Sequence, residues 1–452
     1  MSNDDFFDKL MQADTEAERA AIIALSVIDD LPAFERDVAR LASSLRWFDG
    51  DIIKALCLEI DPASSPDQAS AVYKTIQELP FVEAVPNVGH RLHAQTAEGL
   101  IQNLSEENPD LVQLAHKIAS EAWLEAWEDD YIAQSAVYAL FASNQTELAV
   151  EKFNELRRRF VGAGDWEKLL KLFDLRKKDT FPPFAVLPDL TDIDYFFRGL
   201  AYDYLKDYER AIADYDRAIE LNPEDATAYN NRGNSYSNQG DEERAIADYD
   251  RAIELNPEEA TAYNNRGHSY SNQGDEERAI ADYDRAIELN PEDALAYNNR
   301  GHSYSNQGDE ERAIADYDRA IELNPEDAPA YNNRGNSYYF SGKFQHAIDD
   351  YQKAVELNDQ DGVLMTSLAA CYKELGEIEV AEKWVAKARP LVSQASLYNQ
   401  ACFFSIAGEL DKAIDLLKTA LEKTPTLKDW AAKDPDLRPL HGDSRFQKLV
   451  SS

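Results

Sequence analysis

The chain has 452 residues, of which 85 are acidic and 46 are basic, and its formal net charge at pH 7 is -39. Phosphate backbones and anionic lipid headgroups repel so acidic a chain, which argues against nucleic acid or a membrane as its main partner. The sequence lacks an apolar run long enough to span a bilayer, has acids near its start where a secretory signal has bases, and contains only three scattered cysteines, features that predict a cytoplasmic protein.

A small module is expected in residues 1–104, which begin with a polar segment. Apolar residues recur at helical spacing in residues 32–45 and 49–60, and a third helix is predicted over residues 65–79. The period then changes to two in residues 81–93, on both sides of a Pro- and Gly-containing turn, which predicts a short hairpin. The third helix carries more acidic than basic residues, so DNA binding is not expected.

Three helices followed by a hairpin is the order of a winged helix. Residues 30–104, with the runs at 45–49 and 79–83, resemble the winged-helix segment of bacterial STAND signalling ATPases, relatives of the NLR receptors. In that family a histidine at the place of His93 touches the bound nucleotide, but here Ala94 follows it where the family usually has Asp. The phosphate-binding pattern G-x-x-x-x-G-K-[ST] does not occur in the sequence, so no nucleotide cofactor is expected.

Irregular helical hairpins are expected in residues 105–178, where aromatic and aliphatic side chains return at helical spacing. Residues 179–191 contain three prolines and form the best predicted boundary before a more regular region.

A unit of 34 residues then repeats almost unchanged, because residues 226–259 return as 260–293 and again as 294–327. A period of this length is typical of stacked helical hairpins. Related units are predicted on both sides of the three near copies, at residues 192–225, 328–361, 362–393 and 394–425.

Within one unit, the residue types predict two helices and their ends. Tyr229 and Tyr236 lie seven residues apart on one helical face, and Gly233 between them lets a second helix approach closely. Gly240–Asp241 is predicted to provide a left-handed C-terminal cap and then an N-cap carboxylate for the second helix. Pro257 is expected to end that helix.

This pattern resembles the tetratricopeptide repeat (TPR) family, in which an aromatic, a Gly or Ala, an aromatic, two Ala and a Pro mark each helix-turn-helix. The resemblance implies an all-α fold, a right-handed superhelical solenoid of about seven repeats over residues 192–425. Residues 426–452 resemble the closing segment of many bacterial TPR proteins, and we expect them to cap the last apolar face.

One position departs from the family pattern. The Leu that commonly precedes the Gly is Arg in five successive units, while Asp recurs with the same period on the second helix. Since a buried charge needs a partner, we predict a ladder of Arg–Asp pairs between layers. The residues of this predicted ladder are Arg198, Arg232, Arg266, Arg300 and Arg334 with Asp214, Asp248, Asp282, Asp316 and Asp350.

In the TPR family the first helix of each repeat lines a concave groove, and the positions beside its aromatic face the ligand. The resemblance therefore implies a peptide-binding or partner-binding row of polar residues. Amides both donate and accept hydrogen bonds, so such a row can hold the backbone of an extended peptide; alternatively, each Asn bonds within its own helical neighbourhood. The row consists of Asn230, Asn231, Asn234, Asn264, Asn265, His268, Asn298, Asn299, His302, Asn332, Asn333 and Asn336.

No metal site is expected, because the inner row places no Cys or carboxylate beside His268 and His302. No catalytic residue is predicted either, since paired carboxylates recur in every layer and therefore belong to the scaffold. The sequence favours a non-catalytic adaptor that binds extended peptides or partner proteins in its groove. The alternative is a regulatory or sensor subunit that docks on a separate STAND-type signalling ATPase through residues 1–104.

Overall fold

The computed structural model describes residues 24–29, 31–43, 45, 48, 50–79, 82–85, 89–92, 109–124, 136–140, 142, 145–174 and 189–451. The chain divides into two compact units, Met1–Pro223 and Glu224–Ser452. The polar N-terminal segment, most of the proline-rich boundary and His93 lie outside the described residues. What the sequence predicts for them therefore stays a prediction.

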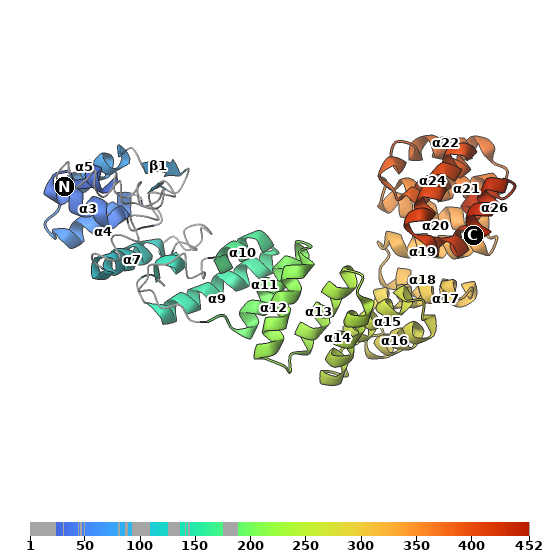
Figure 1. Cartoon of the computed structure of the whole chain (residues 1–452), viewed down its shortest axis with the longest axis horizontal. Helices are drawn as coiled ribbons and strands as arrows, with labels where there is room; N and C mark the ends of the chain where they lie inside the picture. Colours follow the sequence, from blue (N-terminus) through green and yellow to red (C-terminus); the bar gives the residue numbers. More distant parts are fainter. Residues whose placement is uncertain are drawn as a thin grey trace. The chain divides into compact units, whose positions relative to one another are not determined.

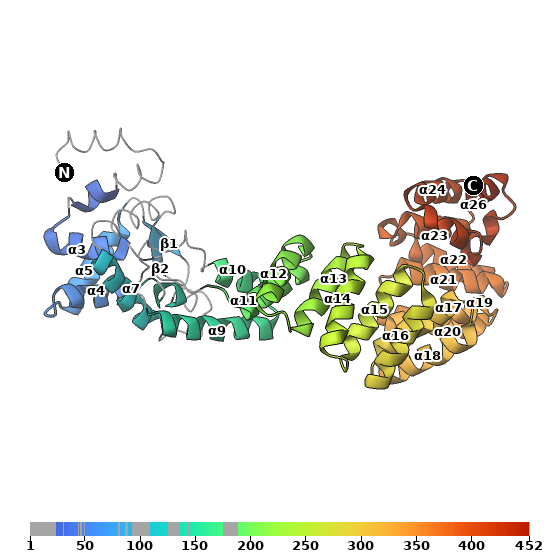
Figure 2. The same cartoon turned by 60° about the horizontal axis from the view of Figure 1, so that its bottom comes forward.

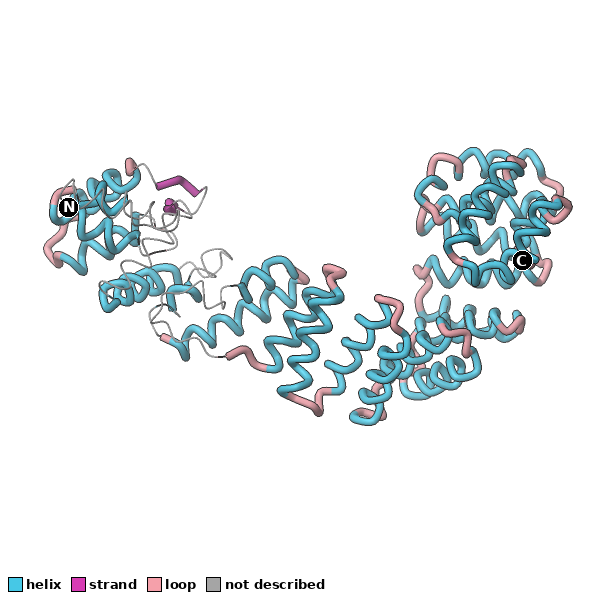
Figure 3. Tube along the Cα trace, viewed as in Figure 1, coloured by secondary structure: helices cyan, strands magenta, loops and turns pink. Residues whose placement is uncertain are grey.

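In its described residues, the first unit consists of helices and one antiparallel pair of strands. In this pair, β1 (Val82–Val85) lies beside β2 (Gly89–Leu92), with Val82 opposite Leu92, in the segment where the sequence predicts a hairpin. Among the described residues these strands form the only sheet, drawn in magenta in Figure 3. The described helices of this unit include α3 (Ala33–Ser43), α4 (Gly50–Ile60), α5 (Pro66–Gln77), α7 (Pro109–Leu124), α9 (Thr146–Ala163), α10 (Trp166–Asp174), α11 (Asp192–Tyr204) and α12 (Tyr208–Leu221).

The second unit is built from helical hairpins in which consecutive helices pack side by side (Figures 1 and 2). Of the helices in the described ranges, none combines the length and the apolar character needed to cross a bilayer. The hairpins are α13 (Ala226–Asn238) with α14 (Glu242–Leu255), α15 (Ala260–Asn272) with α16 (Glu276–Leu289), α17 (Ala294–Asn306) with α18 (Glu310–Leu323), α19 (Ala328–Phe340) with α20 (Phe344–Leu357), α21 (Gly362–Glu374) with α22 (Ile378–Ala388), and α23 (Leu397–Ile406) with α24 (Leu410–Lys423).

Short elements close the second unit after α24. They are the 3-10 segments η3 (Pro425–Leu427) and η4 (Pro435–Leu440), and the helices α25 (Lys428–Ala431) and α26 (Ser444–Ser451); a further 3-10 segment, η2 (Val392–Gln394), precedes α23. Leu437, Leu440 and Phe446 are buried in the same apolar core as α21, α23 and α24. Trp430 differs from them, because 45% of its surface stays exposed.

The turn inside each repeat has the geometry that its sequence predicts. Gly240 adopts a left-handed φ of 80°, which a residue without a side chain tolerates readily. Asp241 then caps the following helix, since its Oδ1 accepts a hydrogen bond from the backbone N–H of Arg244 at 3.1 Å. Helix α14 ends at Leu255, two residues before Pro257. The predicted caps and helix end are therefore confirmed.

Within each hairpin, a buried tyrosine of the second helix packs on a glycine of the first. A methyl carbon added at Gly301 would lie 2.8 Å from Cε1 of Tyr317, closer than carbon atoms pack, and the same contact recurs at Gly335 and Tyr351. The absence of a side chain at this position therefore sets the separation of the two helices.

We expect Gly301→Ala to lower the free energy of unfolding by about 1–3 kcal/mol, because the added carbon forces Tyr317 or the backbone to move. Urea denaturation followed by circular dichroism measures this difference. Gly442→Ala is the matched control, since no atom lies within 4 Å of the carbon added there. Equal stability of the two variants would contradict the proposed steric role of Gly301.

The Arg–Asp pairs form between the predicted partners, but within a repeat. Arg300 donates to both carboxylate oxygens of Asp316, from Nε at 2.8 Å and from Nη2 at 2.7 Å. Its remaining Nη1 donates to Asp284 of the preceding repeat at 2.6 Å. The predicted partners are thus confirmed, whereas the link between layers uses a second aspartate that the sequence interpretation did not assign.

Candidate functional site

Asparagines of neighbouring first helices form a hydrogen-bonded ladder in the second unit. Asn265 Nδ2 donates to Asn230 Oδ1 at 3.1 Å and to Asn234 Oδ1 at 3.0 Å. One layer further, Asn299 donates to Asn264 at 3.1 Å, and Asn333 then donates to Asn298 at the same distance. The acceptors Asn230, Asn264 and Asn298 are buried, whereas Asn234 and the donors are half-buried. The amide row therefore connects the repeats structurally, in addition to any role in binding.

The ladder changes where histidine replaces asparagine. Asn265 uses both of its amide hydrogens in the ladder, whereas Asn299 and Asn333 each use one in the described structure. The difference arises because His268 and His302 occupy the positions equivalent to Asn234. The later part of the row consequently keeps hydrogen-bond donors available to a ligand.

The same replacement affects the tyrosines behind the row. Tyr249 and Tyr351 donate their hydroxyl hydrogens to Asn234 at 2.8 Å and to Asn336 at 2.6 Å, respectively. The equivalent Tyr317, which stands behind His302, makes no such bond in the described structure and is only 1% exposed. Desolvation lowers the pKa of His302, although the residue as a whole is exposed, and thus favours its neutral form.

A cavity of about 260 Å³ lies at the end of the row, between the last repeats and the C-terminal segment. Four residues of the predicted row contribute to its wall: His302, Asn332, Asn333 and Asn336. The other eight predicted residues lie on α13, α15 and α17 and do not line it. The structure thus brings a third of the row together in one concave site and leaves the rest along the helices that precede it.

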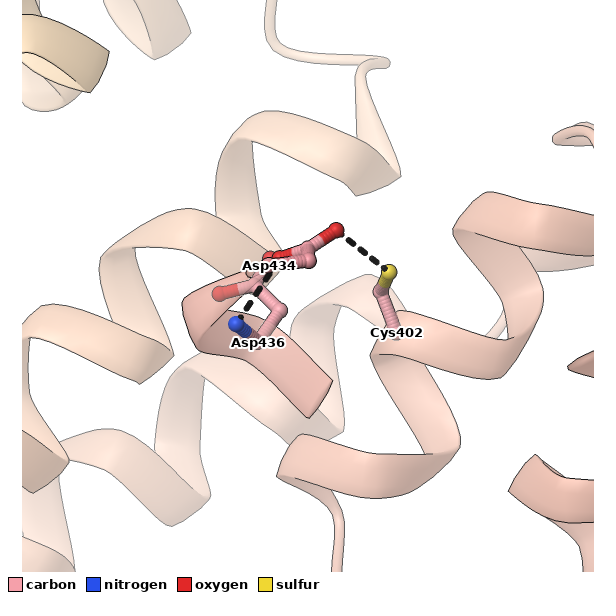
Figure 4. A group of neighbouring side chains, drawn as sticks. All are labelled: Cys402, Asp434 and Asp436. Carbon is pink, nitrogen blue, oxygen red and sulfur yellow. Dashed lines mark hydrogen bonds between the residues drawn. The ribbon is translucent and has the colours of Figure 1, made fainter. Parts of the chain in front are cut away.

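The opposite wall of the cavity comes from α23 and the C-terminal segment. Asp434, at the start of η4, accepts a hydrogen bond from the hydroxyl of Tyr398 at 2.8 Å and a longer one from Cys402 Sγ at 3.6 Å. Its other oxygen accepts the backbone N–H of Asp436 at 2.9 Å (Figure 4). Both acids line the cavity, and their carboxylates come within 4.8 Å of each other.

The environment of these carboxylates favours their protonated forms. Desolvation, reinforced by repulsion from Asp434, raises the pKa of Asp436 to about 8, and desolvation also raises the pKa of Asp434. Burial raises the pKa of the Cys402 thiol well above its usual range. Cys402, Asp434 and Asp436 offer three ligand atoms within 4.8 Å of one another, but a thiol that holds its proton this strongly is a poor metal ligand.

The sequence interpretation missed this second wall. It treated residues 426–452 as an apolar cap and considered only His268 and His302 as possible metal ligands. The available signal was the run Asp434–Pro435–Asp436 close to Trp430, which places two acids and an exposed indole in a short segment. Such a combination is unusual in a segment that only covers apolar surface.

Comparison with protein families matches the repeats directly. Residues 226–259, 260–293, 294–327 and 328–361 each match the tetratricopeptide repeat, and residues 199–240 match a further TPR repeat model. These matches do not include residues 30–104, so the resemblance of that segment to STAND winged helices gains no support from them. No curated protein sequence matches the chain.

Solved structures with similar repeats align with less than half of the chain. MamA is 27% identical, with 36% of this chain and 94% of MamA covered and a TM-score of 0.33. YrrB, described as a TPR protein with an unusual peptide-binding site, is 26% identical, with 40% and 93% covered and a TM-score of 0.34. A thermophilic TPR protein from Thermus thermophilus is 21% identical, with 40% and 98% covered and a TM-score of 0.36.

Proposed function

Because residues 199–361 of this chain are tetratricopeptide repeats, we propose that it is a non-catalytic scaffold or adaptor that binds an extended peptide segment of a partner protein. The peptide lies against the first helices of the repeats, and its main contacts are with the later part of the asparagine row. The cavity that His302, Asn332, Asn333 and Asn336 share with the C-terminal segment is the observation that carries this proposal.

The hydrogen-bonding state of the row supports this placement of the peptide. Asn265 has both amide hydrogens engaged by neighbouring asparagines, so it has no donor left for a ligand. Asn299 and Asn333 each retain one amide hydrogen after their bond to the preceding layer. A backbone carbonyl of an extended peptide accepts such a donor without regard to its own side chain, which favours sequence-tolerant binding.

The double variant Asn299→Ala/Asn333→Ala tests the proposal. We expect it to capture at least tenfold less of a pool of proteome-derived peptides than the intact chain does, because it lacks both free donors. Capture is quantified by mass spectrometry, after circular dichroism has shown that the variant keeps its helices. Asn265→Ala is the matched control, since it removes ladder bonds but no free donor, and we expect it to retain capture.

Equal loss in the control and the double variant would show that the row acts through structure alone and would contradict the proposed contacts. Partners retained by both variants would instead direct attention to the N-terminal unit. In that unit, helices α3, α4 and α5 precede the strands β1 and β2. The alternative function, docking on a separate signalling ATPase, predicts that partners bind to this part of the chain.

A further inference from the structure

The described wall of the cavity at the end of the row contains acidic residues but no Lys or Arg. The acidic residues that line it are Asp434 and Asp436. Of the basic residues next to this segment, Arg438 is engaged by Glu374 at 2.9 Å, and Lys433, which directly precedes Asp434, is exposed and does not line the cavity. The two acids therefore have no Lys or Arg beside them in the described wall of the cavity, and a bound cation would favour their ionised forms.

Aromatic rings stand beside these acids. Phe340 and Trp430 form an edge-to-face pair with ring centroids 5.7 Å apart, and both line the cavity. They remain 38% and 45% exposed, respectively, although each is a large apolar side chain at the end of a well-packed unit. An open indole face beside carboxylates attracts an organic cation both through the ring quadrupole and through charge.

A polar group without a partner also contributes to the wall. Tyr317 is almost fully buried and lines the cavity, yet its hydroxyl makes no hydrogen bond in the described structure. The equivalent hydroxyls of Tyr249 and Tyr351 are satisfied by asparagines. This hydroxyl can therefore bond to a polar group that a ligand in the cavity brings.

We propose that this cavity is a pocket for one cationic side chain, that of lysine or arginine, carried by the extended peptide bound along the row. The inference rests on the proposed function and adds the ligand chemistry to it. The volume of about 260 Å³ lies below the roughly 300–1,000 Å³ typical of drug-sized ligands, which fits one long side chain. Asp434 and Asp436 neutralise its charge, and Trp430 and Phe340 cover its aliphatic stem.

The acid pair supports this assignment independently of the aromatic rings. In the absence of a cation, the two carboxylates repel each other, and this repulsion is part of the reason that the pKa of Asp436 is raised to about 8. A bound ammonium or guanidinium group stabilises the ionised forms and so lowers that pKa. Binding therefore releases a proton near neutral pH. Calorimetry of a bound lysine peptide in buffers of different ionisation enthalpy detects this proton directly.

The test uses the full chain and two pools of random decapeptides, capped at both ends, that differ only at a fixed central residue, lysine or norleucine. Norleucine keeps the aliphatic stem and removes the charge. We expect the lysine pool to be enriched at least tenfold over the norleucine pool on the intact chain. Asp436→Asn should abolish this selectivity, whereas Glu379→Gln, which removes an exposed acid on α22, should preserve it.

The possible outcomes separate the two proposals. Equal capture of both pools, lost in the Asn299→Ala/Asn333→Ala variant, would overturn the cationic pocket and leave peptide binding in the groove intact. Selectivity for lysine that persists in Asp436→Asn would show that the acidic chain attracts cations in general, and it would overturn the proposed pocket. Capture of neither pool would count against both proposals. Binding of Zn²⁺ alone that Asp436→Asn abolishes, without selectivity for lysine, would assign the acids to a metal instead.

Discussion

Arg300→Ala lowers the free energy of unfolding by about 3 kcal/mol, because it leaves two carboxylates without their shared cation. Asp316 is 6% exposed and receives two hydrogen bonds from this guanidinium group. Removing one partner of a buried ion pair typically costs about 3–5 kcal/mol, and the low end applies here because Arg300 itself is only half-buried. Guanidinium denaturation measures the loss.

The repeat offers a control of the same chemistry in an exposed place. Arg312 pairs with Asp309 three residues away, but most of its side chain is exposed, so Arg312→Ala should cost at most about 1 kcal/mol. The double change Arg300→Leu/Asp316→Ala should cost much less than Arg300→Ala, since it removes the buried charge together with its partner. Similar losses for Arg300→Ala and Arg312→Ala would contradict the argument.

Much of the repeat architecture was predictable because its period determines both helices at once. The spacing of Gly233 between two tyrosines predicted a close helix contact, and the contact exists because the ring of Tyr249 fills the space above that glycine. The Gly240–Asp241 turn was predictable for the same reason, since a left-handed cap and an N-cap carboxylate have local sequence signals. These features depend on residues close in the chain.

The partner choice of the arginines shows where such reasoning stops. Arg266 bonds both Asp282 and Asp250, which lie 16 residues after and 16 residues before it. Spacing alone cannot distinguish the bond within a repeat from the bond between repeats, because it contains no information on the rotation between layers. The prediction therefore identified the aspartates within repeats and placed their bonds between layers.

The cavity was not predictable for a different reason. It forms where α19 meets a segment about a hundred residues later in the chain, at Trp430 and Asp434. Burial of Leu437, Leu440 and Phe446 in the core of the last hairpins holds that segment in place. The resemblance to TPR proteins predicted that this segment would cover the last apolar face, but the direction in which its two acids face depends on packing between distant helices.

The pH dependence of the free energy of unfolding provides a second large effect, which arises from the burial of Asp436 and from its repulsion by Asp434. Because the folded-state pKa of Asp436 is about 8, and that of an exposed Asp is about 3.9, the folded chain keeps a proton between those values that the unfolded chain releases. This contribution to stability is fully present below about pH 4 and is lost as the pH rises to about 8. Above that value, both states are ionised and the dependence levels off.

Asp436→Asn removes this dependence, so the variant should become progressively more stable than the intact chain between pH 4 and pH 8. Each pKa unit corresponds to about 1.4 kcal/mol, and after relaxation of the half-buried side chain we expect a difference on the order of 2 kcal/mol at pH 8.

Other groups also act on this carboxyl group or share its surroundings, namely Asp434, Tyr339, Cys371 and Arg438. The free energy of unfolding of the variant is therefore compared with that of the intact chain at each pH. Urea midpoints at several pH values measure it, with Glu379→Gln as the control. Parallel curves for Asp436→Asn and the intact chain would show that neither burial nor Asp434 raises the pKa of Asp436 in the folded protein, and the proton release expected on binding of a cation would then be lost.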